Sequence, residues 1–353
     1  MTEPTSLAPA AQTTPAPGVT AIEALPPEVR EVLERFIVCE YTSLTRTGRP
    51  ITWPITPFVG AHGTLDLTTG LGYPDKAERA RRDPRVALLY SDPTGSGLHR
   101  PPVVLVQGRA AVRDADLQAN TDRFIRDLPT KTTGFAGTPW WVVRRWNWYF
   151  ARIYIEVTPE RVVWWPEGDL SHPPLAWTRP DGADFPTSDP APSGPPVPGR
   201  APAAAAPPDP RPFLDRAEQL GEPVVSAVVD GLPVTLRCRS AVRTPGGFEL
   251  RLPAGAGPVT GPVCLTFHRH GPAMEWQENV VLVGTASESD GDGEGRLLRV
   301  EVERALNDWS LAGGGIRRSR AFLGRARTLR KKMREEAARR GQPVPVVRRP
   351  KPL

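Results

Sequence analysis

Cysteine is scarce in this sequence, and its placement excludes a disulfide framework. Cys39, Cys238 and Cys264 are odd in number, far apart and never in a CxxC spacing. All three fall in apolar segments, which favours buried, inert thiols and a reducing compartment, so we expect a cytoplasmic protein. No run of 18 apolar residues occurs, and residues 1–25 contain no Lys or Arg, so neither a membrane span nor a signal peptide is predicted.

Several catalytic signatures are also missing. The chain contains no Gly-x-Ser-x-Gly, no P-loop and no glycine-rich dinucleotide fingerprint. His268 and His270 share one face of a predicted strand, but no third metal ligand is evident near them. Residues 290–295 have the acidic spacing of a calcium loop, yet they fall between two predicted strands and are interpreted as an acidic hairpin turn. We therefore predict no metal site.

Positive charge is concentrated at one end of the chain. The whole chain carries a formal charge of +6, but residues 316–353 hold 14 of the 45 Lys and Arg and 2 of the 39 Asp and Glu. This tail therefore carries +12, and the rest of the chain carries −6. Apolar residues recur at helical spacing in it, which predicts a basic amphipathic helix and tail over 316–353. The stripe consists of Phe322, Ala326, Leu329, Met333 and Ala337.

Two roles are open for this tail. The favoured interpretation is that the apolar stripe docks on one of the protein's own barrels and leaves a solvated basic face. Alternatively, the tail can contact nucleic acid or an anionic membrane.

Proline and glycine, at 43 and 32 residues, argue against an all-helical protein. We expect residues 1–25 to form a disordered arm, because they cannot build a core. Residues 166–211 contain 14 Pro in 46 positions and predict an extended Pro-rich linker. These two segments and the tail leave two modules, 26–165 and 212–315.

The first module has the pattern of a small antiparallel barrel. Apolar residues at i, i+3, i+4 and i+7 after Pro26 and Pro27 predict a short helix with one buried face. Short segments rich in Val, Ile, Leu, Thr and Trp then alternate with Gly and Pro turns, and one helix is inserted midway. The predicted strands are Val38–Thr45, Pro50–Phe58, Thr64–Thr68, Arg85–Tyr90, Val103–Arg113 and Trp148–Val157.

The second module repeats the first. Gly48-Arg-Pro50-Ile-Thr52 corresponds to Gly231-Leu-Pro233-Val-Thr235, and the run Val104 to Ala110 corresponds to Val280 to Ala286. Leu65 to Gly70 likewise matches Leu250 to Gly255, and Val86 to Tyr90 matches Val263 to Phe267. Four blocks in the same order predict two copies of one barrel, so the fold class is mainly β with α.

One segment carries the residues of an anion site. Thr68 and Thr69 end a predicted strand, and a helix starts near Asp75 and must stop before Pro84. Backbone N–H groups at the helix start, the charges of Lys76 and Arg79, and the threonine hydroxyls together suit a phosphate. The alternative is that these cations only form the solvated face of a surface helix.

The run from Leu65 to Tyr90 resembles the flavin-binding split β-barrel family related to pyridoxamine 5′-phosphate oxidase. Lys76-Ala77 and Pro84 keep that family's spacing, and an apolar strand follows. The resemblance implies two split β-barrels in this chain, with FMN, or a deazaflavin coenzyme, as cofactor. It also implies that Lys76, Thr68 and Thr69 hold the flavin phosphate, to which Arg79 of the predicted anion site would add its charge. Arg49, Thr52 and Trp53 would then lie along the isoalloxazine ring.

The chain also departs from that family. It has no Arg-x-His motif of the true oxidase, so we do not predict pyridoxal phosphate synthesis. In the second copy only Gly257 to Pro262 stand where the first has Lys76 to Arg85, so this barrel is predicted to be degenerate for cofactor binding. The resemblance also implies the arrangement of a homodimer, in which the flavin lies between two barrels. The fused pair would thus be an intramolecular pseudo-dimer with one flavin site per chain, and a further homodimer stays open.

The resulting expectation is an FMN- or deazaflavin-dependent oxidoreductase that transfers hydride to an unidentified small molecule. No protein acid or base is assigned. The alternative is a non-enzymatic flavin-binding, ligand-binding or scaffold protein that retains the split-barrel fold.

Overall fold

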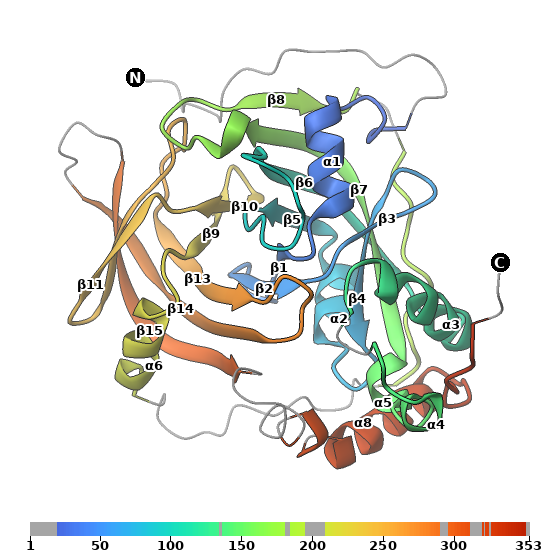
Figure 1. Cartoon of the computed structure of the whole chain (residues 1–353). Coiled ribbons are helices and arrows are strands. Elements are labelled where there is room, and N and C mark those ends of the chain that lie inside the picture. Colours follow the sequence, from blue (N-terminus) through green and yellow to red (C-terminus); the bar gives the residue numbers. More distant parts are fainter. Residues whose placement is uncertain are drawn as a thin grey trace.

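The strands of the computed structural model form two curled antiparallel sheets that lie side by side, with few helices (Figure 1). This architecture confirms the predicted fold class, mainly β with α. The structure describes residues 20–133, 136–180, 184–194, 209–289, 296–310, 320, 322–324 and 326–350.

The first sheet has the strand order β2-β1-β5-β6-β7-β4-β3, and β8 pairs with residues 161–164 of β7. Its strands are β1 (Cys39–Leu44), β2 (Pro50–Ile55), β3 (Phe58–Val59), β4 (Leu65–Gly70), β5 (Arg85–Tyr90), β6 (Val103–Arg113), β7 (Arg152–Trp165) and β8 (Leu175–Thr178). Its helices are α1 (Pro27–Arg35), α2 (Asp75–Arg82), α3 (Leu117–Asp127), α4 (Trp140–Val143) and α5 (Asn147–Phe150), with 3-10 turns at Leu128–Thr130 and Pro166–Gly168.

The second sheet repeats this order as β10-β9-β13-β14-β15-β12-β11. Its elements are α6 (Arg211–Glu218), β9 (Val224–Val229), β10 (Leu232–Arg237), β11 (Ser240–Thr244), β12 (Gly247–Arg251), β13 (Gly261–His270), β14 (Gln277–Ser289) and β15 (Leu297–Ser310). No helix stands between β12 and β13, where the first sheet has α2 between β4 and β5. The proposed hairpin turn at 290–295 lies outside the described residues.

A pair of glycines marks the repeat at the level of the backbone. Gly108 in β6 and Gly284 in β14 each sit at an irregularity where the pairing register to the next strand shifts. A Cβ at Gly108 would lie 2.4 Å from the carbonyl oxygen of Thr158, and one at Gly284 would lie 2.1 Å from that of Glu301. Only glycine allows the two strands to approach this closely.

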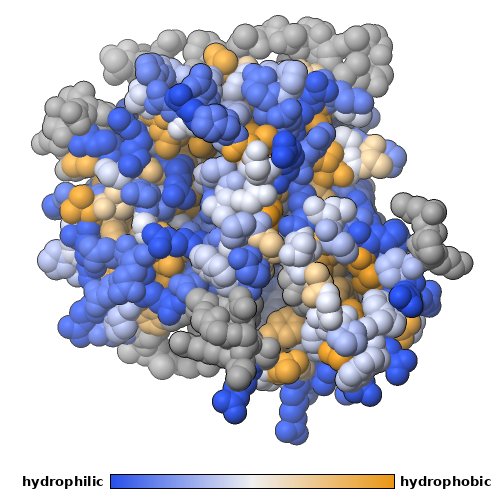
Figure 2. All heavy atoms as spheres, in the orientation of Figure 1, coloured by the Kyte–Doolittle hydropathy of each residue, from blue (hydrophilic) through white to orange (hydrophobic). Residues whose placement is uncertain are grey.

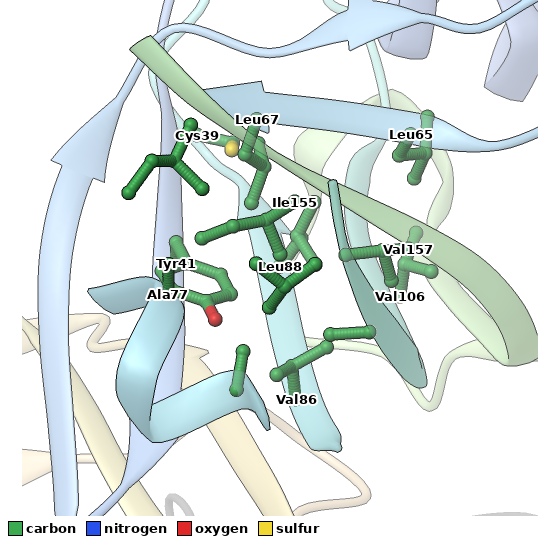
Figure 3. Close-up of a cluster of buried hydrophobic side chains, with 14 of the residues drawn as sticks. Cys39, Tyr41, Leu65, Leu67, Ala77, Val86, Leu88, Val106, Ile155 and Val157 are labelled. Atoms are coloured by element: carbon green, nitrogen blue, oxygen red, sulfur yellow. The ribbon is translucent and has the colours of Figure 1, made fainter. Parts of the chain in front are cut away.

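The interior of the first sheet is filled by alternate residues of its strands (Figure 3). Tyr41, Leu67, Leu88 and Ile155 are fully buried and point toward one another, and Ala77 of α2 lies at the edge of the same cluster. Burial of these side chains is the main stabilising contribution, and truncating one such as Leu88 to Ala would cost about 2–5 kcal/mol.

A buried cluster of hydroxyls joins the two sheets. Thr42 and Thr52 are cross-strand partners on β1 and β2, and Ser226 and Thr235 are the corresponding partners on β9 and β10. The oxygen of Thr42 lies 2.7 Å from that of Thr52 and 2.6 Å from that of Thr235, and Thr52 donates to Ser226 at 2.5 Å. Each buried hydroxyl therefore finds a partner across the seam between the barrels.

The histidines of β13 extend this polar seam. His268 Nε2 lies 2.6 Å from Glu40 Oε1 of β1, and the ring of His270 lies 3.4 Å from an Asp92 carboxylate oxygen. The two histidines share a strand face, as expected, and that face is turned toward the first barrel.

Three expected boundaries change. Ile22 and Leu25 are buried in the first core, so the predicted arm over 1–25 is too long, and residues 1–19 lie outside the described residues. β7 starts at Arg152, because Trp148 belongs to α5. The segment predicted as a Pro-rich linker contains β8, and its Asp189 accepts hydrogen bonds from two backbone N–H groups after β6, both at 2.8 Å.

The basic tail contains α8 (Ala326–Arg339), which lies beside α5 at the lower edge of the first barrel (Figure 1). Ala326, Leu329, Met333 and Ala337 of its stripe are buried in the first core. The apolar stripe therefore docks on the first barrel, as the sequence favours.

Hydrophilic side chains cover much of the face shown in Figure 2, with hydrophobic residues scattered between them. Among the helices that the structure describes, none is long and apolar enough to cross a membrane.

Candidate functional site

Helix α2 presents three different faces to its surroundings. It begins after Pro74 and ends before Pro84, as the sequence predicts. Ala77 and Ala80 are buried against the first barrel. Because residues three apart share one side of a helix, Lys76 and Arg79 point one way, while Glu78 and Arg81 point the other.

Lys76 and Arg79 form a cluster of positive charge with Arg152, the first residue of β7. Burial, followed by the charges of Arg79 and Arg152, lowers the pKa of Lys76 from 10.5 to about 8, although Asp75 opposes this shift. Burial also lowers the pKa values of Arg79 and Arg152.

Two of these cations are held by neutral contacts. Arg79 Nε donates to the Ser43 hydroxyl at 3.0 Å. The Arg152 guanidinium lies 4.3 Å from the ring centroid of Phe124 and 4.5 Å from that of Tyr149. Such cation–π contacts orient a guanidinium without neutralising it.

The charge of this cluster is not balanced. Among the residues that the structure describes, no ion pair joins a carboxylate to Lys76, Arg79 or Arg152, and Arg152 Nε is buried without a hydrogen-bond partner. Buried charges are normally paired, since leaving them unpaired is costly. A bound anion with several oxygens would relieve the mutual repulsion, so the cluster is suited to a phosphate-like group.

An apolar wall adjoins the cluster. The Lys76 ammonium lies 5.3 Å from the Trp53 ring centroid. Trp53 is half-buried and packs on residues of the second sheet. These are Cys264, Val281 and Val283, and Leu306 packs against the same three residues. Burial raises the pKa of the Cys264 thiol to about 11, so that thiol stays protonated and inert.

The structure brings some of the predicted site residues together and separates others. Lys76, Arg79 and Trp53 converge. The Thr69 hydroxyl donates to the Tyr73 carbonyl at 2.7 Å and closes the loop that leads into α2. Thr68 lies on the face of β4 opposite to Thr69. That face also carries Gly70 and its cross-strand partner Arg152.

Arg49 and Thr52 lie at the contact between the barrels. Two nitrogens of Arg49 donate to the carboxylate of Glu303 in the second sheet, at 2.8 and 3.0 Å. The Thr52 hydroxyl is fully buried in the hydroxyl cluster. The Thr52 side chain faces away from Trp53, because alternate residues of β2 face opposite sides. Arg49 stands before β2, and its guanidinium is engaged by Glu303.

Sequence reasoning did not identify Arg152 as part of the site. In the sequence it is only one residue of the predicted strand Trp148–Val157. Its proximity to Lys76 follows from the pairing of β4 with β7, which places it directly opposite Gly70.

Among the described residues, apolar side chains stand at the corresponding place in the second half. By the repeat, Leu236 corresponds to Trp53, Ala87 to Cys264 and Leu105 to Val281. All three belong to one buried apolar cluster that spans both sheets.

Comparison with solved structures finds similar chains of low identity. A Clostridium acetobutylicum protein related to general stress protein 26, of the pyridoxinephosphate oxidase family, is 12% identical, with a TM-score of 0.30 over 43% of this chain and 92% of its own. A pyridoxamine 5′-phosphate oxidase-related, FMN-binding protein from Nostoc punctiforme is 13% identical, with a TM-score of 0.30 over 44% and 93%. A protein described as an F420 reductase is 16% identical, with a TM-score of 0.30 over 39% and 98%. No family model and no curated protein matches the chain.

Proposed function

We propose that this chain binds FMN or a deazaflavin coenzyme in the first barrel and serves as a flavin-dependent oxidoreductase acting on a small molecule. The observation that carries the proposal is the unbalanced cluster of Lys76, Arg79 and Arg152 beside the apolar wall around Trp53. A ligand with a phosphate at one end and a flat apolar ring matches both features. The resemblance of residues 65–90 to the flavin-binding split-barrel family supports the same ligand.

The residues fit such a group through charge and shape. Lys76 and Arg79 would hold the phosphate from α2, and Arg152 would add a third cation from β7. Trp53 and the second sheet would cover the ring and exclude water from it. When bound, the coenzyme supplies the hydride chemistry, and the protein supplies position and electrostatics.

Comparing FMN with riboflavin tests this proposal, because the two differ by the phosphate. We expect purified protein to bind FMN at least about tenfold more tightly than riboflavin, since charge-assisted hydrogen bonds contribute about 1.5–3 kcal/mol each. Lys76→Gln should remove most of this preference. A chain that binds neither FMN nor a phosphorylated deazaflavin above background would refute the proposal and favour a scaffold role.

Lys131 provides a matched control. Burial lowers its pKa to about 8 as well, but its ammonium donates to the Phe36 carbonyl at 2.9 Å, after the end of α1. Lys131→Gln should leave the preference for FMN over riboflavin unchanged. If both lysine variants lower it equally, the effect comes from loss of stability and not from the site.

We further propose that the two barrels act as an intramolecular pseudo-dimer with one flavin site. The second half lacks a helix equivalent to α2, and apolar side chains fill the corresponding place. Titration of FMN into the protein should therefore saturate at one equivalent per chain. Saturation at two equivalents would contradict this asymmetry.

A further inference from the structure

The C-terminal tail contacts α2 on the side opposite the cation cluster. α8 packs on the loop between β4 and α2, where a Cβ at Gly72 would lie 3.1 Å from the Leu329 carbonyl oxygen. Gly72 precedes Lys76 by only four residues. The loop that leads into α2 is therefore in close contact with α8 when the tail is docked.

Ion pairs fasten α2 to the tail. The Glu78 carboxylate receives the guanidinium groups of Arg339 and Arg340, the latter at 3.1 Å. Arg340 also lies 2.9 Å from Asp114, and the second oxygen of Asp114 lies 2.7 Å from Arg81 of α2. The Arg340 side chain is only 2% exposed, so solvent screens these pairs little.

The tail is anchored a second time on α3. The Gln342 side chain accepts from the Leu117 N–H at 2.8 Å and donates to the Asp114 carbonyl at 2.7 Å. Gln118 and the backbone of Val346 exchange two hydrogen bonds of 2.9 Å. These bonds hold the segment that follows Arg340 against α3.

An aromatic contact leads from the tail to Arg152. The Phe322 ring lies 4.7 Å from that of Trp148 and 5.4 Å from that of Tyr149. Tyr149 in turn is one of the two rings that hold the Arg152 guanidinium. The tail therefore supports both elements that carry the cation cluster, α2 and the start of β7.

We propose that the docked tail positions the cation cluster, that Glu78 is the positioning residue, and that tail docking and anion binding at Lys76 are coupled. As far as the ligand is concerned, this inference rests on the proposed function. An eight-residue helix with unbalanced charges on one face is marginal by itself. The ion pairs of Glu78 and Arg81 on the other face of α2 stabilise the helix against that repulsion. Because coupling between two sites is reciprocal, anion binding at Lys76 also favours the docked tail.

Glu78→Gln tests the coupling, with Glu335→Gln as matched control. Glu335 lies on α8 itself, where it pairs with exposed Lys331 and not with α2. Three quantities are measured on the full chain: hydrogen exchange over residues 326–346, the pKa of Lys76 by NMR, and affinity for FMN and inorganic phosphate. We expect faster exchange of the tail, a Lys76 pKa shifted toward 10.5, and about tenfold weaker FMN binding in Glu78→Gln only.

The outcomes separate this inference from the proposed function. A tail that exchanges faster while the Lys76 pKa and both affinities stay unchanged would overturn the coupling, and so would a tail that Glu78→Gln does not loosen. If Glu78→Gln fails to fold, Arg339→Gln removes one of the two partners and is read in the same way. If the natural chain binds neither probe, the proposed function fails, and the Lys76 titration still decides whether the tail positions α2.

Discussion

The pH dependence of phosphate binding provides a direct test of the cation cluster. In the ligand-free protein Lys76 has a pKa of about 8, because burial and two neighbouring guanidinium groups destabilise its ammonium. A bound phosphate favours the ammonium and raises that pKa. Binding therefore takes up a proton above pH 8, and affinity should fall by up to about tenfold per pH unit between the two pKa values.

Calorimetry with FMN and with inorganic phosphate, from about pH 7.5 to 9.5, measures this slope after the phosphate's own ionisation near pH 6 is complete. Two buffers of different ionisation enthalpy count the protons taken up. Lys76→Arg should bind with little pH dependence, because a guanidinium stays protonated throughout this range. A dissociation constant that is constant over this range in the natural protein would refute the role assigned to Lys76.

Three further outcomes follow from the same contacts. Lys76→Met should stabilise the ligand-free protein by about 1–3 kcal/mol below pH 8. This gain should vanish as pH rises toward 10.5, because the pKa of Lys76 is lower in the folded than in the unfolded protein. Urea unfolding at several pH values checks this, and a loss of stability at pH 7 contradicts it. Thr235→Val should cost about 1–3 kcal/mol in thermal unfolding, since it leaves hydroxyls of the buried cluster short of a partner; a neutral effect would mean that the seam carries no polar constraint. Arg49→Ala should change stability by less than about 1 kcal/mol, since its pair with Glu303 is 39% and 40% exposed; a larger loss would show that this pair holds the barrels together.

Local patterns predicted the elements that local chemistry determines. Pro74 and Pro84 bracket α2, because the residue before a proline is disfavoured in a helix. The repeated blocks predicted the repeated strand order, including the glycine that stands at a register shift in each sheet. In each case the signal lies within a few residues of the element.

Local sequence patterns do not predict contacts between segments that are far apart in the chain. Arg152 joins Lys76 only because β4 and β7 are paired, and Glu78 meets Arg340 only because the tail returns to the first barrel. The buried position of Thr52 depends on how the two sheets dock. β8 was missed because a short strand in a Pro-rich segment gains its stability from pairing with β7 and not from its own sequence.

The presence of both barrels on one chain affects how the protein behaves on dilution. In a pair of separate subunits, a site lined by both would disassemble as the protein concentration falls below the dissociation constant of the pair. Here a covalent connection keeps the second sheet at a high effective concentration beside the first. The wall formed around Trp53 by Val281 and Val283 should therefore persist at any protein concentration, so ligand affinity should not vary between nanomolar and micromolar protein.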